Sequence, residues 1–374
     1  MHRSVMIAAT AAALVLFLAA PAAAATPWII VPTPAAAGSG LGSISCTSPS
    51  NCEAVGGPRG PNGGMAEHWD GTSWTIQETP APTTEDRYLT GVSCISPASC
   101  VAVGASVVTA EASFPFAETW DGSTWAIQTV PTPSGAYSVS LSSISCTSAA
   151  MCEAVGDYET LGGGFASHTF AEAWDGSTWA IQPTPNSSAL NVLAAVSCVS
   201  AARCTAVGDG SSVPGGLLIE NWNGLRWVLR KVPLPSPEAG RLNGISCTSA
   251  DSCTAVGEIW GSAGIPGPLA EHWNGTTWAL QAIPGGLGIP NSQAGLDGIS
   301  CTSPISCTAV GYYENKNSTT VAQADVYYRG TWRNQNTAAP ASSKGLNGVV
   351  CFAATACTAV GFGGQSGRAL VEQK

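Results

Sequence analysis

Short runs of alternating apolar and polar residues fill this chain, and Gly, Pro, Asn or Asp bound most of them. One recurring run has the form Leu-x-small-Ile/Val-Ser/Val-Cys, as in residues 89–94 and 242–247. A second run starts at the next cysteine and reads Cys-x-Ala-Val-Gly, as in residues 204–208. Alternation over four to eight residues between turn signals predicts β-strands. We therefore expect many short strands joined by tight turns.

Two further strands follow in each unit, and tryptophans mark their junction. The third strand ends in Glu-x-Trp and the fourth begins with Trp, as in residues 67–74. Asp-Gly or Asn-Gly stands between them in five units, and this pair is a strong hairpin signal because both residues tolerate positive φ. The sixth unit, residues 325–332, has a shortened turn. We expect the paired tryptophans to pack between neighbouring units as core rather than to form sugar-binding platforms.

The unit occurs seven times, and cysteines mark its period. All cysteines fall in C-x5-C pairs, and the first cysteines recur every 48 to 54 residues. The pairs are Cys46/Cys52, Cys94/Cys100, Cys146/Cys152, Cys198/Cys204, Cys247/Cys253, Cys301/Cys307 and Cys351/Cys357. A period of this length with several short strands per repeat is typical of a propeller. The sequence therefore predicts an all-β fold, a seven-bladed β-propeller with four-stranded antiparallel blades.

The two ends of the chain complete each other. The seventh unit runs to the third strand at residues 369–372 and stops at Lys374 without a fourth strand. Residues 28–34, Trp-Ile-Ile-Val-Pro-Thr-Pro, match the fourth strand of the third unit at residues 179–185. We expect this N-terminal strand to join the last blade and close the ring, in preference to an open solenoid with an exposed end.

The cysteines predict one disulfide inside each blade. An even number of cysteines in an exported chain indicates disulfides. Zinc sites favour shorter cysteine spacings together with histidine partners. Each bridge would link the first two strands of its blade.

The first 25 residues read as a secretory signal peptide. A short basic start is followed by an apolar run from about Val5 to Ala20 and by small residues before Thr26. This arrangement predicts cleavage near Ala25, and an uncleaved anchor is the alternative. The mature chain, residues 26–374, is expected to be a single propeller domain, and it has no other apolar stretch long enough to span a bilayer.

Composition limits the classes of partner. Removal of residues 1–25 takes away one charged residue, Arg3. The mature chain then has 13 Lys and Arg against 24 Asp and Glu, a formal charge of −11. Binding to a phosphate backbone needs clustered positive charge, and none is visible. We therefore expect no nucleic-acid partner.

The C-x5-C hairpin followed by W-[DN]-G-x-x-W resembles repeats of exported bacterial propeller proteins of unassigned role. The resemblance covers nearly all of the mature chain and implies the architecture, but it is nearly silent on activity. A more distant similarity is to the Asp-box of sialidase-like propellers, although Asp70-Gly71 lacks the residue that separates Asp and Gly in that box. Even there the box serves folding rather than catalysis, and fold analogy alone does not license a function.

An acidic residue recurs on the third strand of the units. The set is Glu67, Glu118, Glu172, Glu220, Glu271 and Glu372, with Asp325 in the sixth unit. Catalytic carboxylates must lie in a close pair, about 5–10 Å apart, and equivalent positions on successive blades are too far apart. We expect these groups to accept structural hydrogen bonds. His68 and His272 share one position, which we expect to be exposed on a strand, and His168 stands alone in a variable loop.

Variable segments indicate where a ligand would bind. The loops between the second and third strands and the linkers between blades vary in length, and in a propeller both lie on one face. We expect the ligand-binding residues there. The candidates are Arg87, Tyr88, Phe114, Phe116, Tyr158, Trp260, Tyr312 and Tyr313, and Tyr137, Glu159 and Glu314 lie on the same face. Trp260 has the most weight because it is the only Trp outside the repeated positions. Each of these residues could instead simply cover a blade edge.

The sequence favours a secreted, monomeric, non-enzymatic module that binds an extracellular glycan or protein through this face, either free or at the cell envelope. One alternative is a glycan-directed hydrolase, for which Asp86, Asp157, Glu159 and Glu314 are the loop carboxylates to test. Another is a structural component of the cell envelope. We name no catalytic residue, no cofactor and no metal ligand, because no phosphate loop, dinucleotide motif or EF-hand is present. Calcium binding is compatible with all three hypotheses, but no motif demands it.

Overall fold

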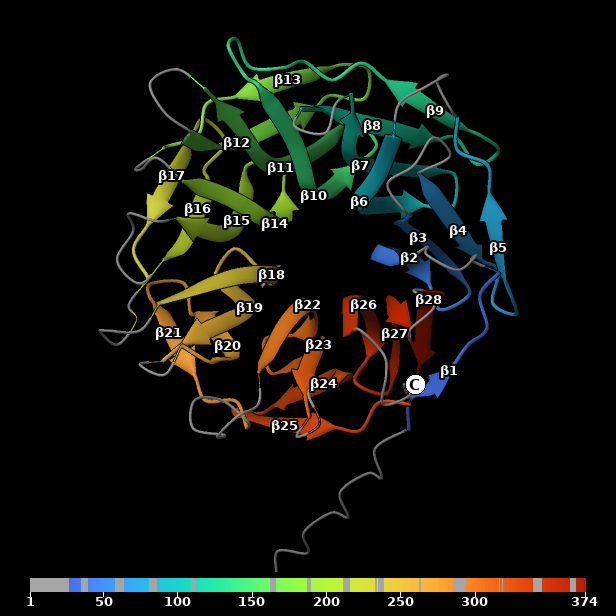
Figure 1. Ribbon diagram of the computed structural model, residues 1–374, viewed down its shortest axis with the longest axis vertical. Coiled ribbons are helices and arrows are strands. Elements are labelled where there is room, and N and C mark those ends of the chain that lie inside the picture. Colours follow the sequence, from blue (N-terminus) through green and yellow to red (C-terminus); the bar gives the residue numbers. More distant parts are fainter. Residues whose placement is uncertain are drawn as a thin grey trace, which may run out of the picture.

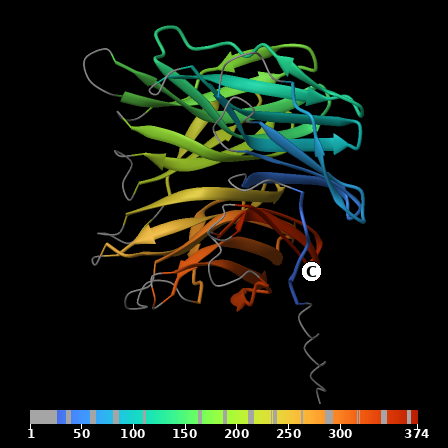
Figure 2. The same cartoon turned by 45° about the vertical axis from the view of Figure 1, so that its right-hand side comes forward.

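The computed structural model describes residues 27–34, 40–57, 64–80, 86–108, 112–161, 166–186, 190–210, 216–232, 234, 239–261, 264–284, 293–315, 317, 319–338, 345–363 and 368–374. These ranges form seven antiparallel four-stranded sheets and contain no helix. Figure 1 shows the sheets as blades around a central axis, and Figure 2 shows the same blades obliquely. The predicted seven-bladed β-propeller is confirmed.

Each blade is an antiparallel meander, and its four strands are named a to d in order from the axis to the rim. Strands a are β2 (Leu41–Ser48), β6 (Asp86–Ser96), β10 (Ser138–Ser148), β14 (Asn191–Ser200), β18 (Ala239–Ser249), β22 (Ala294–Ser303) and β26 (Gly345–Ala353). Strands b are β3 (Asn51–Gly56), β7 (Ser99–Val107), β11 (Met151–Thr160), β15 (Arg203–Gly210), β19 (Ser252–Trp260), β23 (Ser306–Glu314) and β27 (Ala356–Gly363).

The outer strands are shorter towards the rim. Strands c are β4 (Met65–Trp69), β8 (Ser113–Trp120), β12 (Ala166–Trp174), β16 (Leu217–Trp222), β20 (Pro266–Trp273), β24 (Thr320–Tyr328) and β28 (Arg368–Gln373). Strands d are β5 (Trp74–Gln77), β9 (Trp125–Gln128), β13 (Trp179–Gln182), β17 (Trp227–Arg230), β21 (Trp278–Gln281), β25 (Thr331–Gln335) and β1 (Ile29–Ile30). Blade 1 starts at β2, and blade 7 holds β26 to β28 and β1.

The N-terminal strand closes the ring as predicted. Ile29 and Ile30 of β1 pair antiparallel with Gln373 and Glu372 of β28. Trp28 is buried in the core between blades 6 and 7, and the ammonium of Lys374 lies 4.8 Å from the centroid of its ring. Figure 1 shows β1 beside the C-terminus. The two ends of the chain therefore pair with each other, and β1 covers the outer edge of β28.

A disulfide links strands a and b in every blade, as the cysteine spacing predicts. The bridges are Cys46–Cys52, Cys94–Cys100, Cys146–Cys152, Cys198–Cys204, Cys247–Cys253, Cys301–Cys307 and Cys351–Cys357, and no described cysteine is free. Closing so short a loop restricts the unfolded chain by roughly 2 kcal/mol per bridge in the chain-entropy model. Seven such bridges fit an oxidising environment, outside the cell or in its envelope.

Serines next to these cysteines join neighbouring blades near the axis. The hydroxyl of Ser45 accepts a hydrogen bond of 2.9 Å from the backbone N–H of Cys94, and the same contact recurs at five further junctions at 3.0–3.1 Å. At the closing junction, Val350 stands where the serine would be. There the side chain of Asn347 donates 2.9 Å to the carbonyl of Leu41, so blades 7 and 1 are still joined.

Crowding near the axis explains the small residues of strands a. A Cβ atom built on Gly298 would lie 2.6 Å from the carbonyl oxygen of Asn347 in the next blade. A real Cβ cannot approach this closely, so this position accepts only glycine unless the backbones move apart.

The tryptophans form the core between blades, as expected. Trp74, Trp125, Trp179, Trp227 and Trp278 at the start of strands d are all buried. The indole N–H of Trp125 donates 2.6 Å to Gln77 of the preceding blade. The tryptophans that end strands c bond instead within their own blade, as Trp69 does to the carbonyl of Pro49 at 3.2 Å.

The c–d turns differ in detail from the expected two-residue hairpin. Only glycine has a positive φ, 93° at Gly71, while the carboxylate of Asp70 accepts the backbone N–H groups of Thr72 and Ser73 at 2.7 and 2.8 Å. Aspartate thus serves as an acceptor inside a longer turn. Blade 6 has the two-residue form, with positive φ at both Arg329 (48°) and Gly330 (90°).

Candidate ligand-binding site

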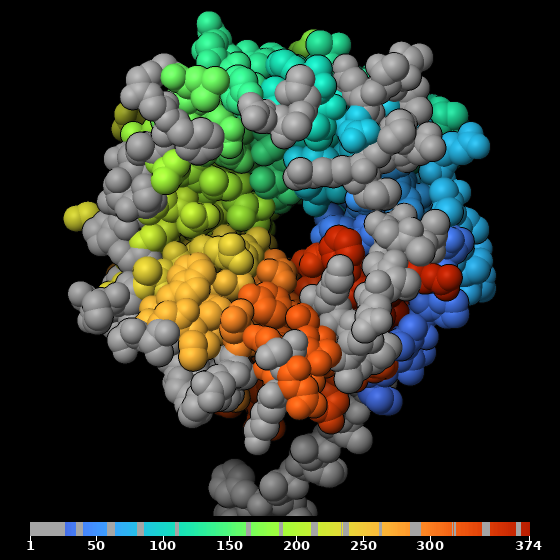
Figure 3. Space-filling model, in the orientation of Figure 1, coloured from blue at the N-terminus to red at the C-terminus, as the bar shows by residue number. Residues whose placement is uncertain are grey.

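The two ends of the propeller differ in what they carry. The turn face carries the disulfide-bridged a–b turns and the c–d turns, and the loop face carries the b–c loops and the blade linkers. A central channel of about 390 Å³ runs between the seven strands a. Figure 3 shows this hollow at the axis. One position of the channel wall is polar in five blades, with Thr90, Ser142, Asn243, Asp297 and Asn347. Asp297 is the charged group among the described residues that line it.

Two candidates in blade 2 are structural. Arg87 is 5% exposed, and its guanidinium donates 2.9 Å to the carbonyl of Pro80 and lies 3.9 Å from the carboxylate of Glu118. The same guanidinium lies 4.7 Å from the ring centroid of Phe116, which is also buried. Arg87 and Phe116 therefore pack inside the blade and offer little to a ligand.

The remaining candidates of blades 2, 3 and 6 are dispersed. Phe114 is exposed and Tyr88 is half-buried, both in blade 2. The ring of Tyr158 lies near those of His168 and Phe170, with centroids 4.9 and 6.2 Å away. His168 lies on strand β12 rather than in the expected loop, and its Nε2 lies 3.4 Å from the hydroxyl of Thr160. Tyr313 is exposed on strand b of blade 6.

Trp260 and Tyr312 are linked through Arg241 and Glu258 at the boundary of blades 5 and 6. The side chain of Glu258 is 2% exposed. Its carboxylate accepts hydrogen bonds from Arg241 at 3.1 Å and from the hydroxyl of Tyr312 at 2.9 Å. The guanidinium of Arg241 also lies 5.8 Å from the ring centroid of Trp260. We call these four residues and Asp297 the mouth cluster.

The absence of a side chain at Gly295 leaves room for the buried carboxylate. A Cβ atom on Gly295 would lie 2.4 Å from a carboxylate oxygen of Glu258, so a larger residue there would force the Glu258 side chain to move. Burial and the Glu258 carboxylate raise the pKa of the Tyr312 phenol well above its usual value, and the phenol stays protonated as a donor. Burial opposes the charge of Arg241, but Glu258 outweighs it and raises the pKa of the guanidinium.

Asp297 adds a second acidic group at the channel. Burial and the charge of Glu258 raise the pKa of Asp297 to about 6, against the opposing effects of Arg241 and Asn243. Asn243 donates 3.2 Å to its carboxylate. The mouth cluster thus combines two acids, one cation and two aromatic rings, and Arg241 is its most accessible charge, with 46% of its side chain exposed.

Further acidic groups continue from the mouth cluster towards blade 3. Burial raises the pKa of Asp209, and the charge of Arg241 opposes this shift. Burial also raises the pKa of Asp157, and the charge of Asp209 adds to that shift. Asp157 accepts hydrogen bonds from Ser140 at 3.0 Å and from Ser167 at 3.3 Å. The charged part of the loop face therefore extends over blades 3 to 6.

The four carboxylates of the hydrolase alternative occupy three blades. Asp86 is in blade 2, and Glu314 is in blade 6. Asp157 and Glu159 share strand b of blade 3, where burial and the charge of Asp157 raise the pKa of Glu159. Both carboxyls of this pair are thus pushed in the same direction, whereas acid–base catalysis by two carboxyls needs their pKa values pushed apart.

The recurring acids of strands c lie buried between blades. Glu67 accepts 2.9 Å from the hydroxyl of Thr33, and Glu372 accepts 2.9 Å from the backbone N–H of Ala338, which confirms structural hydrogen bonding at these positions. Glu172 and Glu271 differ, because neither oxygen of either carboxyl has a hydrogen bond within the described residues. Burial raises the pKa of each of these two carboxyls to about 8, so both are protonated at neutral pH.

The histidines of strands c are not exposed as expected. His68 is half-buried and its Nδ1 lies 2.7 Å from the carboxylate of Glu53 on strand b, and His272 contacts the hydroxyl of Thr254 at 3.2 Å. Their position faces the next blade, so it lies in the groove between two blades. Among the described residues, no group of three or more His, Cys, Asp or Glu is placed to hold a metal ion. The same residues contain no helix long and apolar enough to cross a membrane.

Comparisons with known proteins identify the fold. The chain matches no protein-family model and no curated protein sequence. It is similar to a solved structure described as YCF48 bound to D1 peptide, with a TM-score of 0.59 and 14% identity over 94% of this chain and 98% of that one. It is also similar to YCF48 from Cyanidioschyzon merolae, with a TM-score of 0.57 and 13% identity over the same shares. At this identity the likeness is one of architecture.

Sequence reasoning found two members of the mouth cluster and missed three. Trp260 and Tyr312 stood out as aromatics beyond the repeat. Arg241, Glu258 and Asp297 did not, although each is a charged residue next to a repeat motif: Arg241 precedes Leu242, and Glu258 follows Gly257. Comparing the seven units position by position would reveal these charges.

Proposed function

We propose that this protein is an exported, non-enzymatic recognition module that binds a protein or carbohydrate ligand at the mouth cluster of its loop face. The observation that carries the proposal is the hydrogen-bonded carboxylate of Glu258. Arg241 and Tyr312 reach it from two different blades, so the cluster is held in a fixed geometry beside Trp260. Preorganised aromatic and arginine side chains are the residues that dominate recognition sites.

A peptide segment is the ligand class that the cluster favours. Arg241 lies against the ring of Trp260, and a sugar ring stacking there would have to share the indole with the guanidinium. A peptide can use the same groups, since Arg241, Tyr312 and Asp297 offer both donors and acceptors to backbone and side chains. The description of the YCF48 structure, with a bound D1 peptide on a propeller of the same architecture, supports this preference.

Export rests on the N-terminal sequence. Residues 1–26 lie outside the described residues, so the signal peptide and its cleavage near Ala25 remain predictions. The seven disulfides support them, because such bridges persist in oxidising compartments. N-terminal sequencing of the protein recovered from outside the expressing cells should begin at or near Thr26, and an intact Met1 would contradict export by cleavage.

The binding proposal is tested by screening the oxidised mature chain, residues 26–374, against an array of random peptides and an array of glycans and cell-wall polysaccharides. We expect specific hits among the peptides. Hits among the glycans alone would keep a recognition module but overturn the peptide preference. A blank on both arrays, with the fold and the seven disulfides intact, would contradict ligand recognition of either class.

A further inference from the structure

A polar groove of about 360 Å³ lies on the turn face between blades 4 and 5, on the end of the propeller opposite the mouth cluster. Blade 4 forms one wall with Arg203, Asn221 and Arg230, and blade 5 forms the other with Asp251 and Trp273. This volume is in the range of small-ligand sites. The groove uses none of the loop-face residues that the proposed function depends on.

Two arginines set this groove apart from the corresponding positions of the other blades. The residues that align with Arg203 by their pairing with strand a are Asn51, Ser99, Met151, Ser252, Ser306 and Ala356. The residues that align with Arg230 by their pairing with strand c are Gln77, Gln128, Gln182, Gln281 and Gln335. Two cations thus replace neutral residues at one junction of an acidic protein.

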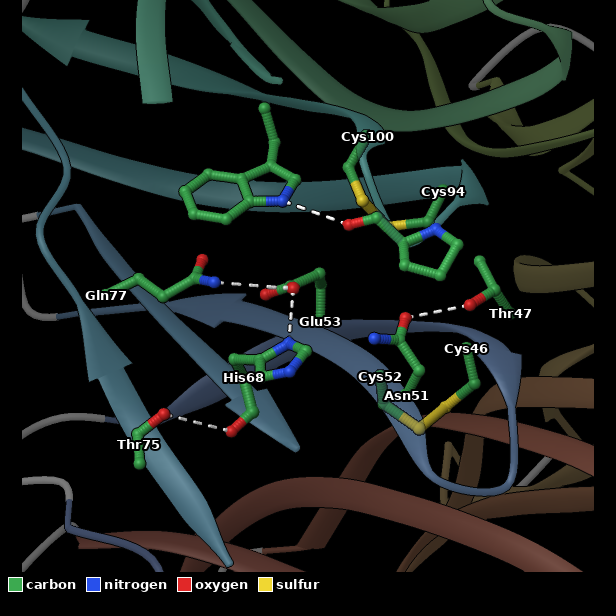
Figure 4. A network of polar contacts seen from close by, with 12 residues as sticks. Cys46, Thr47, Asn51, Cys52, Glu53, His68, Thr75, Gln77, Cys94 and Cys100 are labelled. Atoms are coloured by element: carbon green, nitrogen blue, oxygen red, sulfur yellow. Dashed lines mark hydrogen bonds and ion pairs between the residues drawn. A yellow bond between two sulfur atoms is a disulfide. The ribbon is translucent and has the colours of Figure 1, made fainter. Parts of the chain in front are cut away.

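In blade 1 the same wall is closed by its own polar contacts. Figure 4 shows Glu53 there, with its carboxylate bound by His68 at 2.7 Å and by Gln77 at 3.4 Å. Gln77 also accepts the indole N–H of Trp125 from blade 2. The side chains of this wall therefore bond to each other and to the facing blade through one oxygen of Glu53 and the amide of Gln77.

In blade 4 the equivalent contacts leave a cationic group available. Asn221 donates 2.8 Å to the hydroxyl of Thr205, and its carbonyl oxygen accepts 3.1 Å from Nε of Arg230. Arg230 is bonded through its Nε alone among the described residues. Its two terminal nitrogens have no hydrogen-bond partner among these residues. The guanidinium is thus oriented while its two outer N–H groups remain open to a bidentate carboxylate.

Arg203 also lacks an acidic partner. Its guanidinium donates weakly, at 3.3 and 3.5 Å, to the carbonyls of Ala202 and Asn223, and it forms no ion pair within the described residues. Asp251 faces the groove from blade 5, but its side chain lies against Gly275 of its own blade. The groove therefore has an excess of positive charge.

The flanking turns preserve this charge. The c–d turns of blades 1 to 3 carry Asp70, Asp121 and Asp175, whereas those of blades 4 and 5 carry Asn223 and Asn274. The asparagines make the same turn contacts, as Asn223 does to the N–H of Leu225 and of Arg226 at 3.0 Å. The turns on either side of the groove are thus uncharged at this position, and their backbone hydrogen bonds are the same as in blades 1 to 3.

An aromatic side chain completes the lining. Trp273 is half-buried in the groove, and its indole is fixed by a hydrogen bond of 3.1 Å to the carbonyl of Ala250. A sugar ring presents an apolar face that packs on indole, while its hydroxyls suit amide and hydroxyl groups such as Asn221. We propose that this groove binds the uronate-containing segment of an acidic polysaccharide, with the sugar carboxylate held between Arg230 and Arg203.

The repeat itself supplies variants that test the site without disturbing the fold. Arg230→Gln and Arg203→Ser introduce the residues found at the equivalent positions of other blades. Arg226→Thr is the matched control, because it also removes one exposed cation of blade 4 and introduces the residue of blades 2, 3 and 5, but Arg226 does not line the groove. The probes are tetragalacturonate, the neutral tetrasaccharide maltotetraose and hexaglutamate peptide, with binding measured by calorimetry on the full mature chain.

We expect tetragalacturonate to bind, more weakly at high salt, and maltotetraose not to bind. Each groove substitution should weaken tetragalacturonate binding at least about tenfold, since each removes a charge-assisted hydrogen bond, while Arg226→Thr stays within about threefold. Trp260→Ala should leave it unchanged, which separates this site from the mouth cluster. No binding of tetragalacturonate, equal binding by the Arg203→Ser/Arg230→Gln variant, or tighter binding of hexaglutamate would each overturn the proposal.

Discussion

The hydroxyl of Tyr312, in blade 6, donates a hydrogen bond of 2.9 Å to the carboxylate of Glu258, in blade 5. The contact crosses a blade boundary beside the channel, and Arg241 holds the same carboxylate oxygen from the other side. A buried carboxylate with two such donors is costly to disturb, because loss of one donor leaves charge poorly compensated. The mouth cluster is therefore a candidate binding site, and it also joins blades 5 and 6.

Replacement of Tyr312 by Phe should destabilise the protein. The substitution removes the donor to Glu258 and keeps the ring, so we expect a loss of about 1–3 kcal/mol in the free energy of unfolding. Urea denaturation monitored by tryptophan fluorescence measures it. Tyr313→Phe is the control, since Tyr313 is 37% exposed, and it should change stability by less than about 0.5 kcal/mol. Equal effects of the two substitutions would refute a special role of the Tyr312 hydroxyl.

Stability should fall as the pH rises from 5 to 9. Burial raises the pKa of Glu172, Glu220 and Glu271 from the usual 4.5 to about 8. Between these values the folded protein keeps protons that the unfolded chain releases, so folding is favoured at the acidic end and the advantage disappears as the pH passes 8. Melting temperatures at pH 5, 7 and 9 measure the slope.

A neutral variant tests the origin of this slope. Glu172→Gln and Glu271→Gln replace carboxyls that are already protonated at pH 5, so the double variant should show a shallower decline than the wild type. The exposed turn aspartates do not interfere, because hydrogen bonds from Thr72 and Ser73 lower the pKa of Asp70 to about 2, outside the window. A melting temperature that rises from pH 5 to 8 would show that these carboxyls are not buried as described.

The N-terminal strand should be essential for a stable ring. Trp28 is 4% exposed and packs in the core between blades 6 and 7, so Trp28→Ala should cost about 3–5 kcal/mol. Ile30→Ala is the control on the same strand, because Ile30 is 47% exposed. Thermal unfolding and limited proteolysis of blade 7 report the difference. A tolerated Trp28→Ala would mean that β1 contributes little to closure.

Each disulfide should contribute locally and modestly. Replacing Cys198 and Cys204 together by serine opens one hairpin, and the short loop predicts a loss of roughly 2 kcal/mol. Unfolding should remain cooperative because the hydrogen bond from Cys247 to Ser197 still joins blades 4 and 5. Peptide mapping without reduction should find only bridges within repeats, and a bridge between repeats would contradict the blade assignment.

The repeat made the fold predictable from the sequence, but it did not allow the residues of the binding site to be predicted. Seven copies of one pattern fix where strands and bridges lie, and the likeness of residues 28–34 to residues 179–185 reveals the closure. No comparable sequence pattern shows which side chains of the variable segments are buried. Arg87 reads as a loop cation, yet the carbonyl of Pro80 and the ring of Phe116 enclose it. Glu258 and Tyr312 lie 54 residues apart and meet only because successive blades stack face to face.

Dissociation constants of the best peptide from the array test the central claim most directly. They should be measured by calorimetry for the wild type, Trp260→Ala, Arg241→Gln and Tyr328→Ala. Tyr328 is an exposed aromatic on the turn face, so it is the matched control. We predict that the two mouth-cluster substitutions weaken binding at least about tenfold while the protein stays folded, and that Tyr328→Ala has no effect. Unchanged binding by both mouth-cluster variants would contradict the assignment of the site.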